Sequence, residues 1–304
     1  MDALLRLVLA PERPAATDAL ATWWASTSGR RTAWEASIDR AIAGGACADR
    51  IGYAFAAAYG EALAALVGDR VPSGIHALCA TEEGGNHPRA IKTTLTTQPD
   101  GSFVLTGKKK WATGATHASS LLVVATTGDG PDGKPQLRVA RVPTEASGVR
   151  MTPAAASFVP EVPHAELELD HVRIPAVDVL PGDGYDAYLK PFRTIEDLHV
   201  HAALLAYAIG VARRNRFPHE LVEQLLALLV SVRALGLADP RAATTHLALA
   251  GVLASLHERL PDLERPWAAL ADDEWRRWER DRMIFKIASA ARTARRDRAW
   301  SAFA

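Results

Sequence analysis

The sequence is poor in cysteine, carries no net charge and has no long apolar run. Two cysteines among 304 residues cannot build a disulfide framework, and such usage is typical of a reducing compartment. The 35 basic and 35 acidic side chains cancel, so no global field attracts the chain to nucleic acid or to a membrane surface. We therefore expect no polyanionic partner.

Metal-ligand patterns and membrane-directing segments are also lacking. The histidines form no His-Glu-x-x-His pattern, and Cys47 and Cys79 stand far apart, so no metal site is expected. The N-terminal apolar run follows Asp2 instead of a basic segment and ends at Pro11, which fits neither a signal peptide nor a membrane span. No other segment reaches roughly 18 uninterrupted apolar residues. These features predict a soluble, cytoplasmic protein.

Hydrophobic periodicity divides the chain into three zones, and the first zone is helical. In the segment 51–68, Phe55, Tyr59 and Leu63 recur at the spacing of one buried helical stripe. Residues 1–72 are therefore predicted to form an N-terminal helical domain.

The second zone, residues 73–181, changes to a period of two. Its alternating segments, rich in valine, leucine and threonine, are 102–115, 119–128, 135–143 and 164–175. The stretch 128–135 is rich in glycine and proline and has the composition of a loop that joins two antiparallel strands. This zone is predicted to form a β-domain, as a small antiparallel barrel or sandwich.

The third zone, residues 182–304, returns to helical spacing. The predicted helices are 184–214, 219–236, 241–260 and 272–303. Each segment between them carries a proline, placed where a helix must end or begin. Four helices with short connections predict an up-and-down bundle. The expected fold class is α+β, with N-terminal helices, a central antiparallel β-barrel domain and a C-terminal four-helix bundle.

Three motifs stand in a fixed order along the second zone. Residues 79–93 contain Thr-Glu-Glu-Gly-Gly-Asn and end in Ile-Lys-Thr, residues 105–125 contain Gly-Lys-Lys-Lys-Trp-Ala-Thr, and residues 167–186 contain Leu-Asp-His-Val-Arg-Ile-Pro. In the acyl-CoA dehydrogenase family the corresponding segments are Thr-Glu-Pro with Gly-Ser-Asp, Gly-x-Lys-x-Trp-Ile-Thr, and Phe-x-x-Val-x-Val-Pro. The chain thus resembles a short, divergent member of that family, whose fold has the same order of zones.

The resemblance implies an FAD site on the β-domain, made of Cys79, Thr81, Gly85, Asn86, Trp111 and Thr113. Trp111 would stack beside the flavin ring, Thr113 would reach its N5/O4 edge and Thr81 its O2/N3 region. Gly85 and Asn86 would line the diphosphate through backbone donors. Taken singly, each of these residues is equally an ordinary strand or turn residue. Their combination favours the flavin interpretation.

Dehydrogenation of an acyl thioester requires a carboxylate base in an apolar pocket. The Glu-Gly-Thr loop that usually carries the family's glutamate is missing, but some members place that glutamate on the first bundle helix. On the segment 185–210, Glu196 and His199 fall within an apolar stripe, while Asp197 and His201 point away from it. Glu196 and His199 are the predicted catalytic pair. The alternative is a Glu–His pair satisfied at a bundle or subunit interface.

The resemblance implies α,β-dehydrogenation of an acyl thioester with FAD, and a possible electron-transfer partner. The missing Glu-Gly-Thr loop motivates a flavin monooxygenase on the same fold as an alternative. A missing Arg-x-x-Phe-Gly segment, which normally reaches the flavin of a neighbouring subunit, motivates a non-catalytic partner subunit. The segment 221–232 is apolar nearly all round, which predicts a homodimer. The arginine-rich segments 272–282 and 291–298 are predicted as a solvated helix start and a helix end, with phosphate contacts as the alternative.

Overall fold

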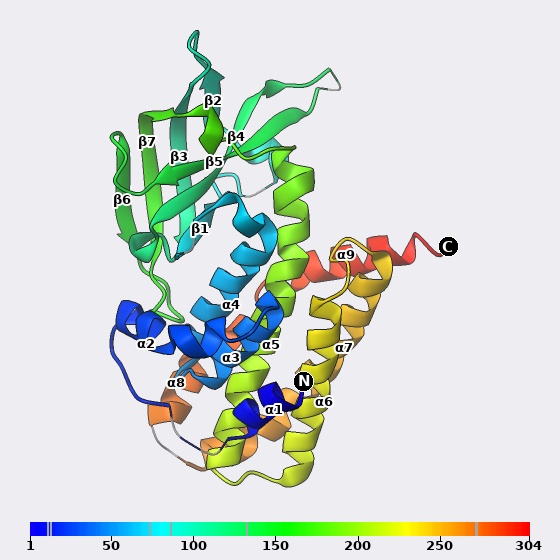
Figure 1. Ribbon diagram of the computed structural model, residues 1–304. Coiled ribbons are helices and arrows are strands. Elements are labelled where there is room, and N and C mark those ends of the chain that lie inside the picture. Colours follow the sequence, from blue (N-terminus) through cyan, green and yellow to red (C-terminus); the bar gives the residue numbers. More distant parts are fainter. Residues whose placement is uncertain (11, 13, 73, 86, 132, 271–272) are drawn as a thin grey trace. The chain divides into compact units, whose positions relative to one another are not determined.

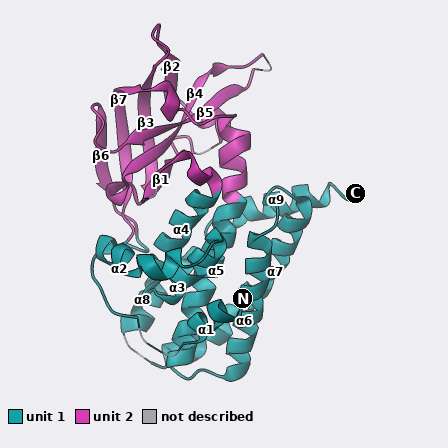
Figure 2. Cartoon of the chain, in the orientation of Figure 1, with its two compact units in different colours: residues 1–65, 157–161, 194–304 teal, residues 66–156, 162–193 magenta. Residues whose placement is uncertain are grey.

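The computed structural model describes residues 1–10, 12, 14–72, 74–85, 87–131, 133–270 and 273–304. The chain divides into two compact units (Figure 2). Unit 1 comprises Met1–Ala65, Ser157–Glu161 and Thr194–Ala304, and unit 2 comprises Leu66–Ala156 and Val162–Arg193. Helical segments from both ends of the chain therefore belong to one unit. The domain boundaries at 72 and 181 expected from the sequence stay a prediction.

The α-helices lie wholly or mostly in unit 1 (Figure 2), and Figure 1 labels them. They are α1 (Asp2–Leu9), α2 (Leu20–Thr32), α3 (Ser37–Ala46), α4 (Ile51–Val67), α5 (Lys190–Arg214), α6 (His219–Gly236), α7 (Ala243–Ala268), α8 (Asp273–Asp281) and α9 (Ser289–Trp300). Apolar residues at intervals of three and four explain why these segments pack as helices. In α6, for example, Leu225, Leu229 and Val232 form one buried stripe.

Two of the predicted C-terminal helices differ from the structure. The predicted helix 241–260 continues to Ala268, with Pro261 and Pro266 inside it, so the interpretation of these prolines as helix breaks is wrong. The buried stripe continues through both of them, as Leu260, Leu263 and Trp267, and the packing of that stripe offsets the cost of proline in a helix.

The last predicted helix, 272–303, is two helices in the structure. A 3₁₀ turn, η6 (Arg282–Phe285), and a left-handed residue, Ala288 with φ 65°, separate α8 from α9. The predicted helices 184–214 and 219–236 correspond to α5, preceded by the π-helical turn η5 (Gly184–Leu189), and to α6.

Unit 2 is built on a curled sheet of seven strands (Figure 1). The strands are β1 (His76–Cys79), β2 (Thr94–Thr97), β3 (Phe103–Thr113), β4 (Ser120–Asp129), β5 (Pro135–Pro143), β6 (Val149–Ala154) and β7 (His164–Ile174). Their order is β1-β4-β2-β3-β7-β6, and β5 pairs with β4. The four strands expected from alternation are confirmed as β3, β4, β5 and β7. The expectation of an all-antiparallel domain is wrong, because β4 pairs in parallel with both β1 and β2.

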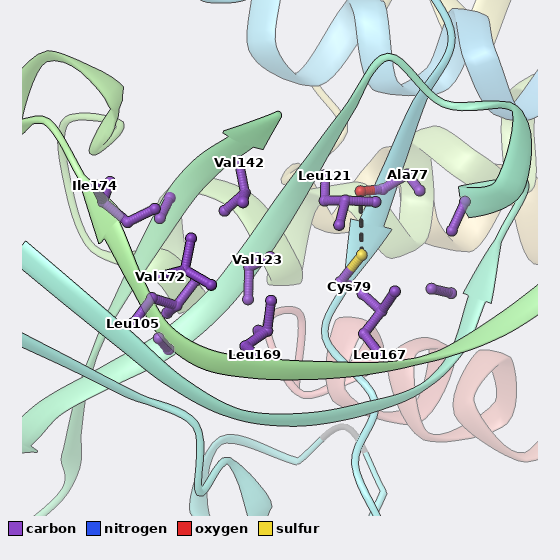
Figure 3. Close-up of a cluster of buried hydrophobic side chains, with 14 of the residues drawn as sticks. Ala77, Cys79, Leu105, Leu121, Val123, Val142, Leu167, Leu169, Val172 and Ile174 are labelled. Atoms are coloured by element: carbon purple, nitrogen blue, oxygen red, sulfur yellow. Dashed lines mark hydrogen bonds between the residues drawn. The ribbon is translucent and has the colours of Figure 1, made fainter. Parts of the chain in front are cut away.

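The core of unit 2 lies on one face of this sheet (Figure 3). Alternate residues of β4 and β7, such as Leu121, Val123, Leu167 and Leu169, are almost fully buried there. Cys79 belongs to the same cluster, and its thiol donates to the carbonyl oxygen of Ala77 at 3.5 Å (Figure 3). This alternation is the period of two that marked the zone as β-structure.

Two helices of unit 1 approach each other closely at Gly45 on α3. A Cβ atom placed there would lie 2.1 Å from the carbonyl oxygen of Ala203 on α5. Only glycine permits this approach, because the obstructing atom belongs to backbone. By contrast, a Cβ atom at Gly29 in α2 would meet nothing within 4 Å.

The segment Ser157–Glu161 is held in unit 1 by a buried carboxylate. Asp281, which is 0% exposed, accepts a hydrogen bond from the backbone amide of Val159 at 2.7 Å and pairs with Arg280 at 2.7 Å. Arg280 also pairs with Glu161 at 2.8 Å. Because Glu274, Trp278 and Asp281 are buried, the interpretation of 272–282 as a solvated helix start is wrong; Asp272 lies outside the described residues.

Two helical stretches, Ile51–Arg70 and Gly184–Arg214, are long and apolar enough to cross a membrane by length and composition alone. They are 72% and 89% buried inside the protein over their most apolar windows. Core helices pass the same test, so this is weak evidence for a membrane.

Candidate functional site

Trp111 is the most unusual residue of the sheet. Its side chain is 54% exposed, and its backbone is left-handed with φ 58°. The register between β3 and β7 shifts between Lys109 and Ala112, so a bulge surrounds Trp111 and turns it out of the ladder. A left-handed non-glycine residue costs roughly 1–2 kcal/mol. The exposure of this flat aromatic surface is therefore accompanied by backbone strain in β3.

Thr113 follows Trp111 by two positions on β3. The residue between them, Ala112, is fully buried, whereas Thr113 is partly exposed. The placement of the two side chains on one face of the strand stays a prediction.

His164, which no sequence motif identified, flanks this aromatic surface. It lies opposite Thr113 in the β3–β7 register, and its ring meets that of Trp111 edge-on, with 6.1 Å between centroids. Burial lowers the pKa of His164, although a hydrogen bond to the backbone of Val162 opposes the change, and the buried Nδ1 has no hydrogen-bond partner among the described residues. A neutral imidazole thus supports the tryptophan. The sequence alone could not predict this contact, because it depends on the register between β3 and β7, which pairs residues some fifty positions apart.

The loop that follows β1 is a tight turn. The amide of Glu82 donates to the carbonyl of Gly85 at 3.0 Å, and the amide of Gly85 donates back to Glu82 at 2.9 Å. Gly85 has φ 97°, which favours glycine. The carbonyl of Thr81 accepts from the amide of Lys110 on β3 at 2.8 Å. The Gly85 amide predicted to face the diphosphate is therefore already used within the loop, and Asn86 lies outside the described residues.

Beneath this turn lies a buried ion pair. Glu82 is 7% exposed and Lys109 on β3 is 1% exposed, with 2.6 Å between Oε1 and Nζ. Burial alone would raise the pKa of Glu82, but Lys109 and the backbone amides of Thr93 and Lys92 outweigh burial and lower it. The sequence motif contained both charged residues, yet their pairing depends on the folded loop.

Cys79 differs from its predicted role. Its side chain is 0% exposed, and burial raises the pKa of its thiol to about 12. The thiol lies among apolar core residues (Figure 3), so the prediction that it contacts the cofactor is wrong for the side chain.

A groove of about 350 Å³ opens beside the same loop. Arg89, Lys92, Thr126 and Asp129 line it. Two cations against one carboxylate suit a ligand that carries an anionic group.

The predicted base, Glu196, belongs to unit 1. Burial and the neighbouring Asp197 raise the pKa of its carboxyl to about 7, and Arg292 opposes this shift. A carboxyl group with a pKa near neutrality is matched to the task of a general base. Asp197 itself is paired with Arg292 and Arg295 of α9, at 2.8 and 2.6 Å. Both arginines thus serve an internal carboxylate, which weakens the alternative of a phosphate site at 291–298.

The predicted pair of Glu196 with His199 does not form. Nδ1 of His199 lies 2.7 Å from the carbonyl oxygen of Ile195, and Nε2 lies 2.9 Å from the hydroxyl of Ser37. Both ring nitrogens are therefore occupied, and burial lowers the pKa of His199 to about 4. His199 links α5 to α3 as a neutral side chain. Within the described residues, no cluster of His, Cys, Asp and Glu could hold a metal ion.

A family model matches the part of the chain that carries the aromatic surface and the loop. The model described as "Acyl-CoA dehydrogenase, middle domain" matches residues 77–172, which run from β1 into β7. This segment of the chain is therefore similar to the acyl-CoA dehydrogenase family. "Probable acyl-CoA dehydrogenase YngJ" of Bacillus subtilis is 31% identical over 133 residues, or 43% of this chain. The chain covers 33% of that relative's own length.

Solved structures of the acyl-CoA dehydrogenase fold match most of the chain. Butyryl-CoA dehydrogenase from Megasphaera elsdenii has a TM-score of 0.66 at 16% identity, over 87% of this chain and 82% of that one. TdsC from Paenibacillus sp. A11-2, solved with FMN and indole, has a TM-score of 0.67 at 15% identity, over 92% of each chain. These likenesses concern the fold alone, and they confirm the expected α+β class. The fold family includes dehydrogenases and monooxygenases, and its members typically bind a flavin.

The residues present here fit a flavin at its ring. Trp111 offers an exposed aromatic face, and the partly exposed Thr113 adds a hydroxyl two positions along the strand. At the phosphate side, the Gly85 amide is taken, and the nearby cations are Arg89 and Lys92 of the groove.

Proposed function

We propose that this chain is a flavin-dependent oxidoreductase that acts on an acyl thioester. The observation that carries the proposal is Trp111, an exposed tryptophan held in a strained backbone inside the segment that matches the family. Strain at an exposed aromatic residue is typical of a binding surface. A bound flavin, FAD in our proposal, would supply the acceptor for the hydride that leaves the acyl chain.

The chain's own residues have distinct tasks in this proposal. Trp111 and Thr113 bind and orient the ring system, and Thr81 contributes from the loop. Glu196 takes the α-proton of the thioester on its carboxylate, which forms as the pH rises past about 7. His199 is a structural residue instead of a catalytic one, because both of its nitrogens are engaged. We further propose a cytoplasmic homodimer that passes electrons to a partner protein.

The test is flavin uptake followed by reduction. Purified protein is titrated with FAD and, separately, with FMN, and the visible spectrum is recorded before and after anaerobic addition of acyl-CoA thioesters. We expect one flavin to bind and to be bleached by a thioester. Failure to take up either flavin would contradict the proposal and would favour a non-catalytic partner subunit.

A matched pair of tryptophan variants locates the site. Trp111→Leu is expected to weaken flavin binding at least tenfold. Trp300→Leu serves as the control, because Trp300 is exposed to a similar extent, 59%, but lies on α9. Equal flavin affinity in the two variants would remove Trp111 from the site.

A second candidate is a flavin monooxygenase. It is favoured by the structural match to TdsC, a dibenzothiophene monooxygenase whose structure was also solved with FMN and indole. A flavin that thioesters leave oxidised, but that consumes oxygen once reduced chemically, would support this candidate over dehydrogenation.

A further inference from the structure

The buried pair of Glu82 and Lys109 closes the loop between β1 and β2. The carboxylate of Glu82 accepts four hydrogen bonds: from the amide of Lys92 at 2.7 Å, from the amide of Thr93 at 3.0 Å, from the hydroxyl of Thr93 at 2.8 Å and from Nζ of Lys109 at 2.6 Å. One carboxylate therefore joins the start of the loop, its end and strand β3. No other described carboxylate of unit 2 has this many partners on three segments.

A close backbone approach reinforces the same junction. A Cβ atom placed at Gly107 on β3 would lie 2.4 Å from the hydroxyl and 2.6 Å from Cα of Thr93. Glycine at 107 thus lets the end of the loop rest directly on β3, next to the residues that bond Glu82. The close approach of Gly107 to Thr93 and the Glu82–Lys109 ion pair therefore both hold the end of the loop against β3.

The junction of the loop with β3 is adjacent in sequence to the aromatic surface at Trp111. Lys109 precedes the bulge that turns Trp111 outward, and the amide of Lys110 donates to the carbonyl of Thr81 at 2.8 Å. Any shift of Lys109 relative to Glu82 would therefore move Thr81 relative to Trp111. The proposed ring site uses both of these residues.

We propose that the Glu82–Lys109 pair is a positioning clamp that fixes the loop 81–93 against β3 and thereby sets the flavin affinity of the surface at Trp111. The statement about flavin rests on the function proposed above, whereas the statement about the loop does not. A buried ion pair adds little net stability, because desolvation of two charges offsets their attraction. Its four-fold coordination is better explained by the geometry that it imposes.

Neutral variants separate positioning from stability. The singles Lys109→Met and Glu82→Gln each leave a buried charge without its partner, so both are expected to lower Tm. The double variant Glu82→Gln/Lys109→Met removes both charges and should recover most of the lost Tm. If the clamp positions the loop, the double variant still shows at least tenfold faster amide exchange at residues 92 and 93, and at least tenfold weaker flavin binding.

A neighbouring pair on the same strand is the matched control. Lys108 pairs with Glu168 at 3.3 Å, but these side chains are 78% and 45% exposed. The variant Glu168→Gln/Lys108→Met is expected to keep wild-type Tm, loop exchange and flavin affinity. Changes in the control equal to those in the clamp variant would overturn the inference, because they would reflect strand charge and not position.

A milder variant keeps the inference testable if the charge variants fold poorly. Thr93→Val removes one donor to Glu82 without removing a charge. We expect about threefold faster exchange at the amide of Thr93 and a similar loss of flavin affinity. Wild-type loop exchange in Thr93→Val, or in a fully folded double variant, would overturn the clamp. Wild-type protein that takes up no flavin would instead overturn the proposed function, and the exchange comparison would still decide the clamp.

Discussion

Replacing Trp111 by glycine is expected to give a more stable protein than replacing it by alanine. Both changes remove the ring, so the difference between them reports the backbone alone. At φ 58° a residue with a Cβ atom pays roughly 1–2 kcal/mol, which glycine avoids. Glycine loses about 0.5–1 kcal/mol through its larger freedom in the unfolded chain. The balance favours Trp111→Gly by up to about 1.5 kcal/mol.

The assay is reversible urea unfolding of the flavin-free variants at 25 °C, followed by circular dichroism. Lys108 on the same strand provides the control, because it is exposed and is not among the described residues with positive φ. There the order should reverse, with Lys108→Ala more stable than Lys108→Gly by about 0.5–1 kcal/mol. The same order at both positions would refute the argument that Trp111 is strained. The strained backbone would then need another explanation, and the case for a binding surface would lose its main support.

Two further predictions concern unit 1. Gly45→Ala should destabilise the protein by about 1–3 kcal/mol because its Cβ atom would meet the carbonyl oxygen of Ala203, whereas Gly29→Ala should stabilise it by up to about 1 kcal/mol; thermal unfolding measures both, and equal shifts would contradict the close helix approach. The pKa of Glu196, raised to about 7, means that the folded state holds the carboxyl proton more tightly than the unfolded state does. The protonated carboxyl therefore adds to the free energy of unfolding below pH 4.5, and this stabilisation is lost as the pH rises through about 7. Glu196→Gln should remove up to about 3 kcal/mol of this pH dependence, less where water screens the partly exposed carboxyl, and should abolish turnover; a variant with wild-type turnover would exclude Glu196 as the base.

Long periodic segments of this fold were predictable from the sequence, and short ones were not. Strands β3 and β7 each carry enough alternating residues to establish a period of two, whereas β1 and β2 have four residues each. The two prolines of α7 show the limit of local signals. A proline disfavours a helix locally, but the apolar stripe that runs past Pro261 and Pro266 is buried by the rest of the bundle, and burial decides the outcome.

The candidate site likewise has residues that the sequence could identify and contacts that it could not. The motif around Trp111 identified the residue, because its neighbours in sequence carry the resemblance. Contacts that depend on register or loop closure were out of reach: His164 against Trp111, and Glu82 against Lys109. The error at His199 has the same origin. Helical spacing places it within reach of Glu196, but the partner it bonds, Ser37, comes from a helix more than 160 positions earlier in the chain.

The division of the chain into units has a consequence for how the protein is made. Unit 2 occupies residues 66–156 and 162–193, whereas unit 1 needs α1–α4, the segment Ser157–Glu161 and everything from Thr194 onward. As a ribosome extends the chain, the sheet has all of its strands before α6 has been synthesised. Helix α3, which carries the buried Ile38 and Ile42, packs against α1 and α2, which are made before the sheet, and against α6, which is made after it. The sheet is thus expected to fold during translation, before the helices of unit 1 that follow it have been synthesised.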